Sequence, residues 1–243
     1  MIRFLALLCF VVGPAMAQPK AADYAWDPKP GASVPLDTTF HDDRGDLLPL
    51  RAAFDGKPVV LDLGYYHCPT LCGPVRADLL HALRASGLPD DAYRLVSLSI
   101  DPAERPSDAA TARHADGGAP GWFYLTGAAP AIAAVADAVG FRSWWDAGLQ
   151  QFLHPAGVVL LTPSGRVSDT LLGVGYTGEA MRAGLLRAAG GGIAAPPSPI
   201  VLLCFHFDEA TGRYSLAIEK VLRLMGVLTV LTLGGTLWVM HRR

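Results

Sequence analysis

Short apolar segments alternate with amphipathic ones through the middle of the chain. Segments 58–66, 93–100 and 122–125 are rich in β-branched and aromatic residues, which is typical of buried strands. Four further segments have the composition or the apolar spacing of helices, and they lie at 75–86, 107–115, 128–140 and 177–189. Apolar runs within 157–173 flank a Pro-Ser-Gly turn, which predicts a hairpin. This order predicts an α/β domain with a mixed central sheet.

Both ends of the chain carry long apolar segments. Arg3, the run FLALLCFVVG and the small residues up to Ala17 predict a secretory signal peptide over 1–17. A retained anchor is the alternative, although the run is shorter than the roughly 20 residues that span a bilayer. Near the other end, residues 224–240 contain no charged side chain and would reach about 25 Å as a helix. We therefore expect a transmembrane helix over 222–240 and, because 241–243 is HRR, a cytoplasmic tail.

These two signals predict a single-pass protein of the bacterial inner membrane whose globular part lies in the periplasm. Segments 18–37 and 190–199 are rich in Pro and Gly, and we interpret them as an extended lead-in and a linker. Residues 38–189 between them are enough for one domain. The order of its elements fits the thioredoxin-like arrangement.

Charge and cysteine content narrow the function. The formal net charge is −2 and there is no basic run, so nothing indicates a nucleic-acid partner. Of four cysteines, Cys9 would leave with the signal peptide, and Cys68, Cys72 and Cys204 would remain. An odd number of cysteines in an oxidising compartment favours a metal or redox role over a fully paired disulfide framework.

Two of these cysteines lie four positions apart in YYHCPTLCGPV, directly after a predicted strand. If a helix begins near Pro69, Cys68 and Cys72 share one face, with Cβ atoms about 5–6 Å apart. A helix N-terminus also favours thiolate over thiol. Because Pro74 would interrupt a helix, we expect an irregular turn to carry the cysteines and the regular helix to begin at Pro74. Two thiolates are soft ligands that select Cu(I), or zinc when further ligands converge.

A third ligand is sought among seven histidines. His81 and His114 fall on predicted helices, where a solvated ring is the ordinary state, and His67 is expected to point away from Cys68. His154 precedes Pro155, which favours extended geometry, and stands just before the predicted hairpin. Position alone leaves both a ligand and a purely structural role open for His154.

The motifs LGYYHCPTLC, VSLSIDP and FLHPAGVVLLTPSGRV together resemble the SCO/SenC family of copper-delivery proteins, over about Phe40 to Ala189. The resemblance implies a thioredoxin-like fold and one copper ion, as Cu(I) and also Cu(II), bound by Cys68, Cys72 and His154. It further implies delivery to the binuclear copper site in subunit II of cytochrome c oxidase, with other periplasmic copper carriers or thiol reductants as further partners.

The chain departs from the family pattern in three ways. Thr70 and Leu153 stand where the family commonly has acidic residues, and the predicted anchor is C-terminal where many relatives have an N-terminal one. Neither substitution removes a ligand. We hypothesise that the lost negative charge weakens Cu(II) binding more than Cu(I) binding.

A predicted juxtamembrane hairpin over 200–219 offers a second candidate site. Alternation with period two places Cys204, His206 and Asp208 on one face. Cys204 and His206 could bind a second, weaker copper ion or relay the first. The alternative is an edge hairpin with a buried cysteine.

Three functions compete at this stage. The first is a copper metallochaperone, which is not an enzyme. The second is a thiol-disulfide oxidoreductase that uses Cys68 and Cys72 as a redox pair to reduce the copper-site cysteines of the oxidase subunit. The third is a peroxiredoxin-like peroxidase, for which the chain lacks a matching Thr and Arg constellation.

Overall fold

The computed structural model describes residues 24–69, 72–195, 205–208 and 213–216, with six further positions between 226 and 240. The elements are β1 Thr39–His41, β2 Leu47–Pro49, the 3-10 helix η1 Leu50–Ala53, β3 Val59–Gly64, α1 Cys72–Ala85, β4 Arg94–Ser99, α2 Pro106–Ala115, β5 Trp122–Leu125, α3 Ala129–Val139, β6 Trp144–Asp146, β7 Gln151–Leu153, β8 Gly157–Leu161, β9 Val167–Leu172, α4 Gly178–Ala189, β10 Phe205–Asp208 and β11 Arg213–Leu216.

A five-stranded sheet in the order β5-β4-β3-β8-β9 forms the centre of the domain. Strands β3, β4 and β5 are parallel, whereas β8 runs antiparallel to β3 and forms a hairpin with β9. The predicted α/β fold with a mixed central sheet is therefore confirmed. The pairing of β3 with β8 brings the strand that leads into the cysteine motif beside the strand that follows His154.

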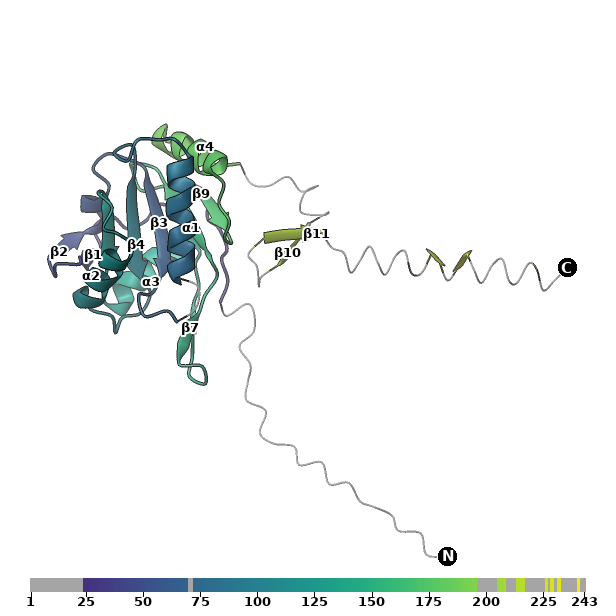
Figure 1. The fold of residues 1–243 in the computed structure, drawn as a ribbon, viewed down its shortest axis with the longest axis horizontal. Helices are drawn as coiled ribbons and strands as arrows, with labels where there is room; N and C mark the ends of the chain where they lie inside the picture. The colour runs from purple at the N-terminus through teal and green to yellow at the C-terminus, as the bar shows by residue number, and fades with distance from the viewer. Residues whose placement is uncertain are drawn as a thin grey trace, which may run out of the picture.

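Both faces of the sheet are buried, which explains why its strands are almost continuously apolar. Successive side chains of β3 point to opposite faces: Leu61 packs in one core cluster with Val135 of α3, and Val60 packs in another with Leu79 of α1 and Leu185 of α4. Figure 1 shows α1 and α4 close together against the sheet. The cysteine motif therefore begins at the end of β3, a strand that is packed on both faces.

Helix α1 begins at Cys72, so the expectation that the regular helix starts at Pro74 is wrong. The first N–H groups of a helix have no intrahelical partner, so a proline within the first turn removes no hydrogen bond. Cys72 is therefore held by regular helical backbone.

Two short hairpins were not expected from the apolar pattern. One joins β1 to β2, and the other joins β6 to β7. The β6–β7 hairpin reaches away from the rest of the domain in Figure 1 and exposes Trp144 and Trp145. Its second strand ends at Leu153, so it leads directly into His154.

The segment before β1 is extended and packs on the domain. Trp26 is 5% exposed, and its Nε1 donates a hydrogen bond to the carbonyl oxygen of Val139 over 3.0 Å. Gly140 has φ +75°, and a Cβ atom there would lie 1.7 Å from the carbonyl oxygen of Asp27. The close approach of the two backbones therefore depends on glycine.

Strands β10 and β11 are antiparallel, with His206 opposite Ser215, so the hairpin expected within 200–219 is present. The predicted signal peptide at 1–17 lies outside the described residues, as does Cys204, and the side chain of His206 is not described. Most of the predicted membrane helix at 222–240 also lies outside them. Among the residues that the structure describes, no helix has both the length and the apolar character to cross a bilayer.

Candidate metal centre

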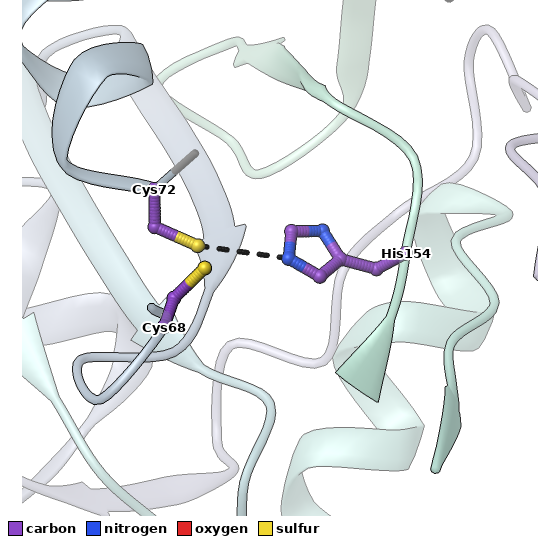
Figure 2. A group of neighbouring side chains, drawn as sticks. All are labelled: Cys68, Cys72 and His154. Carbon is purple, nitrogen blue, oxygen red and sulfur yellow. Dashed lines mark hydrogen bonds between the residues drawn. The ribbon is translucent and has the colours of Figure 1, made fainter. Parts of the chain in front are cut away.

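Three elements bring Cys68, Cys72 and His154 together, as Figure 2 shows. Cys68 lies in the turn after β3, Cys72 is the first residue of α1, and His154 follows β7. One ligand atom from each lies within 4.8 Å of the other two, and Cys72 Sγ is 3.6 Å from His154 Nε2. Ligand atoms that surround one first-row transition metal lie roughly 3.5–4 Å apart. Small movements therefore suffice for all three to reach one ion.

The His154 ring is oriented by its neighbour. Its Nδ1 is 3.1 Å from the carbonyl oxygen of Pro155. Because a carbonyl only accepts, Nδ1 carries the proton and Nε2 presents its lone pair toward Cys72. A backbone carbonyl that fixes the tautomer in this way is the usual support of a metal-binding histidine. The rings of Tyr65 and Phe141 flank His154, with centroids 5.9 and 6.0 Å away.

Both cysteines are thiols, with Cys72 buried and Cys68 half-buried. A hydrogen bond with Cys68 and then burial raise the pKa of Cys72 well above that of a free thiol. The expectation that the helix N-terminus favours thiolate is therefore wrong for Cys72, because the hydrogen bond with Cys68 and burial both favour the thiol. A soft metal must displace the proton when it binds.

The three side chains line a cleft of about 200 Å³ that is otherwise mostly apolar. Phe152 and Leu153 from β7 line this cleft, together with Leu63 from β3 and Val75 from α1. Such surroundings exclude water and strengthen the interaction between a cation and thiolate ligands.

One carboxylate also lines this cleft, that of Asp62 in the middle of β3. It is 8% exposed and accepts a hydrogen bond from Ser97 Oγ over 3.1 Å. Burial raises the pKa of Asp62, while the positive charge of Arg76 and the Ser97 hydrogen bond lower it in part. We did not predict this residue from the sequence, although an aspartate inside an apolar strand was a visible signal.

His67 does not belong to the group. Its Nδ1 faces Glu104 Oε1 over 3.1 Å, which agrees with the expectation that it points away from Cys68. His81 and His114 are exposed on α1 and α2, as expected for solvated histidines. Within the described part of the chain, Cys68, Cys72 and His154 are the one group with suitable metal-ligand geometry. The predicted second site at Cys204 and His206 lies outside the described side chains.

Comparison with known proteins identifies the family. The family model SCO1/SenC matches residues 37–189. The mitochondrial SCO2 homolog of Bos taurus is 32% identical over 143 residues, which are 55% of this chain and 52% of that protein. The chain thus spans about half the length of this curated relative.

Solved structures share the fold. A crystal structure of a proposed electron transfer protein from Aquifex aeolicus VF5 aligns with a TM-score of 0.62 and 27% identity, over 67% of this chain and 95% of that one. The structure of Bradyrhizobium japonicum ScoI with copper bound aligns with a TM-score of 0.52 and 23% identity, over 66% of this chain and 98% of that one. The fold is the thioredoxin-like α/β fold of Sco structures. Because the family model covers more than half of the chain, the chain belongs to the SCO1/SenC family.

Proposed function

We propose that this protein is a copper metallochaperone that carries one copper ion on Cys68, Cys72 and His154. The observation that carries the proposal is the convergence of two sulfur atoms and one imidazole nitrogen within 4.8 Å. ScoI from Bradyrhizobium japonicum and ScoI from Arabidopsis thaliana both have structures with copper bound, which supports copper as the cargo.

The donor set suits reversible carriage of Cu(I). Two thiolates and a neutral imidazole are soft or borderline ligands, and three of them leave room for a ligand from an acceptor. Loading releases the thiol protons, since only thiolates bind the ion. Transfer then proceeds as acceptor ligands replace Cys68, Cys72 and His154 in turn. The same group could hold Cu(II), more weakly for want of an acidic neighbour at Thr70.

We further propose that the acceptor is the binuclear copper site in subunit II of cytochrome c oxidase. One solved relative is described as a member of the Sco family of cytochrome c oxidase assembly proteins. Such an acceptor requires the domain to lie on the periplasmic side of the bacterial inner membrane. The sequences of segments 1–17 and 222–240 support this location, with the first as a signal peptide and the second as an anchor.

A second candidate function is reduction of the acceptor's copper-site cysteines. The two thiols are close enough to share a hydrogen bond, and one solved relative is described as having a disulfide switch. In this reaction one thiolate attacks an acceptor disulfide and the other resolves the mixed disulfide. The products are the Cys68–Cys72 disulfide and an acceptor dithiol, so two electrons pass to the acceptor.

The variant His154→Ala separates the two functions. The full-length protein would be loaded with one equivalent of Cu(I), and transfer to the metal-free copper domain of the oxidase subunit would be measured. If carriage is the function, His154→Ala loses transfer and retains disulfide exchange. His81→Ala, an exposed histidine on α1, is the matched control and should behave as wild type. Undiminished transfer by His154→Ala would contradict the metallochaperone proposal.

The proposal of a second, weaker copper ion at Cys204 and His206 has its own test. Copper stoichiometry of Cys204→Ser would be compared with that of wild type at saturating copper. A fall in stoichiometry supports the site, whereas an unchanged ratio of one ion per chain removes it.

A further inference from the structure

Each of the three side chains at the centre needs support from the fold if the ligand atoms are to stay close together. Cys72 is held by the first turn of α1, and His154 is oriented by the carbonyl of Pro155. Cys68 belongs to neither a helix nor a strand and sits in the turn between β3 and α1, as Figure 2 shows. Its position therefore depends on what holds that turn.

The buried carboxylate of Glu104 holds the turn between β3 and α1. Glu104 lies between β4 and α2, and its side chain is 1% exposed. Oε2 of Glu104 accepts the N–H of Tyr66 over 2.9 Å, and Oε1 accepts the N–H of His67 over 2.7 Å. Ser99 Oγ, at the end of β4, donates to Oε2 over 2.6 Å. These two N–H groups belong to the two residues directly before Cys68.

The chemistry of these contacts requires a carboxylate. Both backbone N–H groups only donate, so both oxygens must accept. A glutamine could accept with one atom alone, and its NH2 group would face either the N–H of Tyr66 or the N–H of His67. One of these two amides would then lose its partner, and the turn would relax away from the end of β4.

We propose that Glu104 is a positioning residue for the metal centre, which holds the turn that places the Cys68 thiol against Cys72 and His154. Glu104 is not itself a ligand and acts through the backbone of Tyr66 and His67, with the His67 ring as a further contact to Oε1. The proposal rests on the proposed copper-binding function, and it adds to the family's three ligands a residue that sets the geometry of one of them.

The test compares two carboxylates that each accept two backbone N–H groups, Glu104 with both oxygens and Asp78 with one. Asp78 Oδ2 accepts the N–H groups of Gly175 and Tyr176 over 2.5 and 3.1 Å, in the loop before α4. Asp78→Asn is therefore the matched control for Glu104→Gln in the full-length protein. Three quantities are measured: Cu(I) affinity by competition with a chromophoric chelator, hydrogen exchange of the backbone amides in the metal-free protein, and thermal stability.

We expect Glu104→Gln to lower Cu(I) affinity about 10–100-fold, the usual effect of losing a residue that orients a ligand. The amides of Tyr66 and His67 should exchange faster in this variant. Asp78→Asn should keep wild-type affinity even where its thermal stability falls as far. Equal affinities in Glu104→Gln and wild type, or an equal loss in Asp78→Asn, would overturn the proposal.

If Glu104→Gln does not fold, Glu104→Asp is measured in its place. This variant keeps both carboxylate oxygens but moves them away from the turn by the length of one methylene group. Wild-type Cu(I) affinity and wild-type amide exchange in Glu104→Asp would then overturn the proposal. If the wild-type chain binds no copper, the proposed function fails. Amide exchange in the metal-free protein still decides whether Glu104 holds the turn.

Discussion

The ion pair between Arg76 and Asp116 should dominate the stability of the helix that carries Cys72. Arg76 Nε lies 2.6 Å from Asp116 Oδ2, and the two side chains are 9% and 12% exposed. Tyr124 donates its hydroxyl to the same oxygen over 3.1 Å. The positive charge of Arg76 also lowers the pKa of Asp62. Arg76→Met would thus leave the buried carboxylates of Asp62 and Asp116 without their cation.

Breaking a buried pair by removing one partner costs about 3–5 kcal/mol. For a domain of this size that corresponds to a fall of roughly 6–20 °C in melting temperature. The loss of unfolding free energy in Arg76→Met should depend on pH. Without Arg76, the folded-state pKa of Asp62 moves further above its unfolded value. Stability of the variant therefore falls as pH rises through the unfolded pKa of about 4, and the deficit is smallest in acid.

Chemical unfolding followed by tryptophan fluorescence, at neutral pH and near pH 4, measures both effects. Arg84→Met is the control, because Arg84 is exposed on the same helix and should cost less than about 0.5 kcal/mol. If Arg76→Met cost no more than Arg84→Met, or if its deficit grew in acid, the reasoning from burial and charge would be refuted.

Two further predictions concern the core around the site. Asp62→Asn should stabilise the protein at neutral pH by on the order of 1 kcal/mol, because burial raises the pKa of Asp62 and ionisation therefore costs stability above the unfolded pKa. Melting curves at neutral and acidic pH should show that the gain in stability disappears in acid. A variant less stable than wild type at neutral pH would contradict this prediction. Gly140→Ala should cost about 2–4 kcal/mol, since it adds a clash with the carbonyl of Asp27 to a left-handed backbone. Gly117→Ala has a similar φ and nothing within 4 Å, so a calorimetric comparison that found equal costs would refute the role of the clash.

The fold could be predicted from the sequence because its strands are buried on both faces. Largely apolar runs mark β3, β4, β5 and β8, and helical spacing marks α1 and α4. The short β6–β7 hairpin could not be predicted in this way, because its three-residue strands lie outside the central sheet and are half exposed. The start of α1 was misplaced because a proline is compatible with a first helical turn.

The site could be predicted only in part. Spacing alone brought Cys68 and Cys72 together, whereas His154 was singled out by its place before Pro155 and by family resemblance. Its approach to Cys72 depends on the pairing of β3 with β8, across 82 positions of the chain. The role of Glu104 could not be predicted from the sequence pattern, because its hydrogen bonds reach backbone groups 37 and 38 positions away. Hydrogen bonds from a side chain to backbone groups far away in the chain produce no periodic pattern in the sequence.

The central claim is that two sulfur atoms and one imidazole nitrogen bind the same copper ion. X-ray absorption at the copper edge, on the full-length protein loaded with one equivalent of Cu(I), measures this directly. We predict two sulfur neighbours and one nitrogen neighbour in wild type and in His81→Ala, and loss of the nitrogen in His154→Ala. A wild-type spectrum with sulfur neighbours alone, or a nitrogen that survives His154→Ala, would contradict the account.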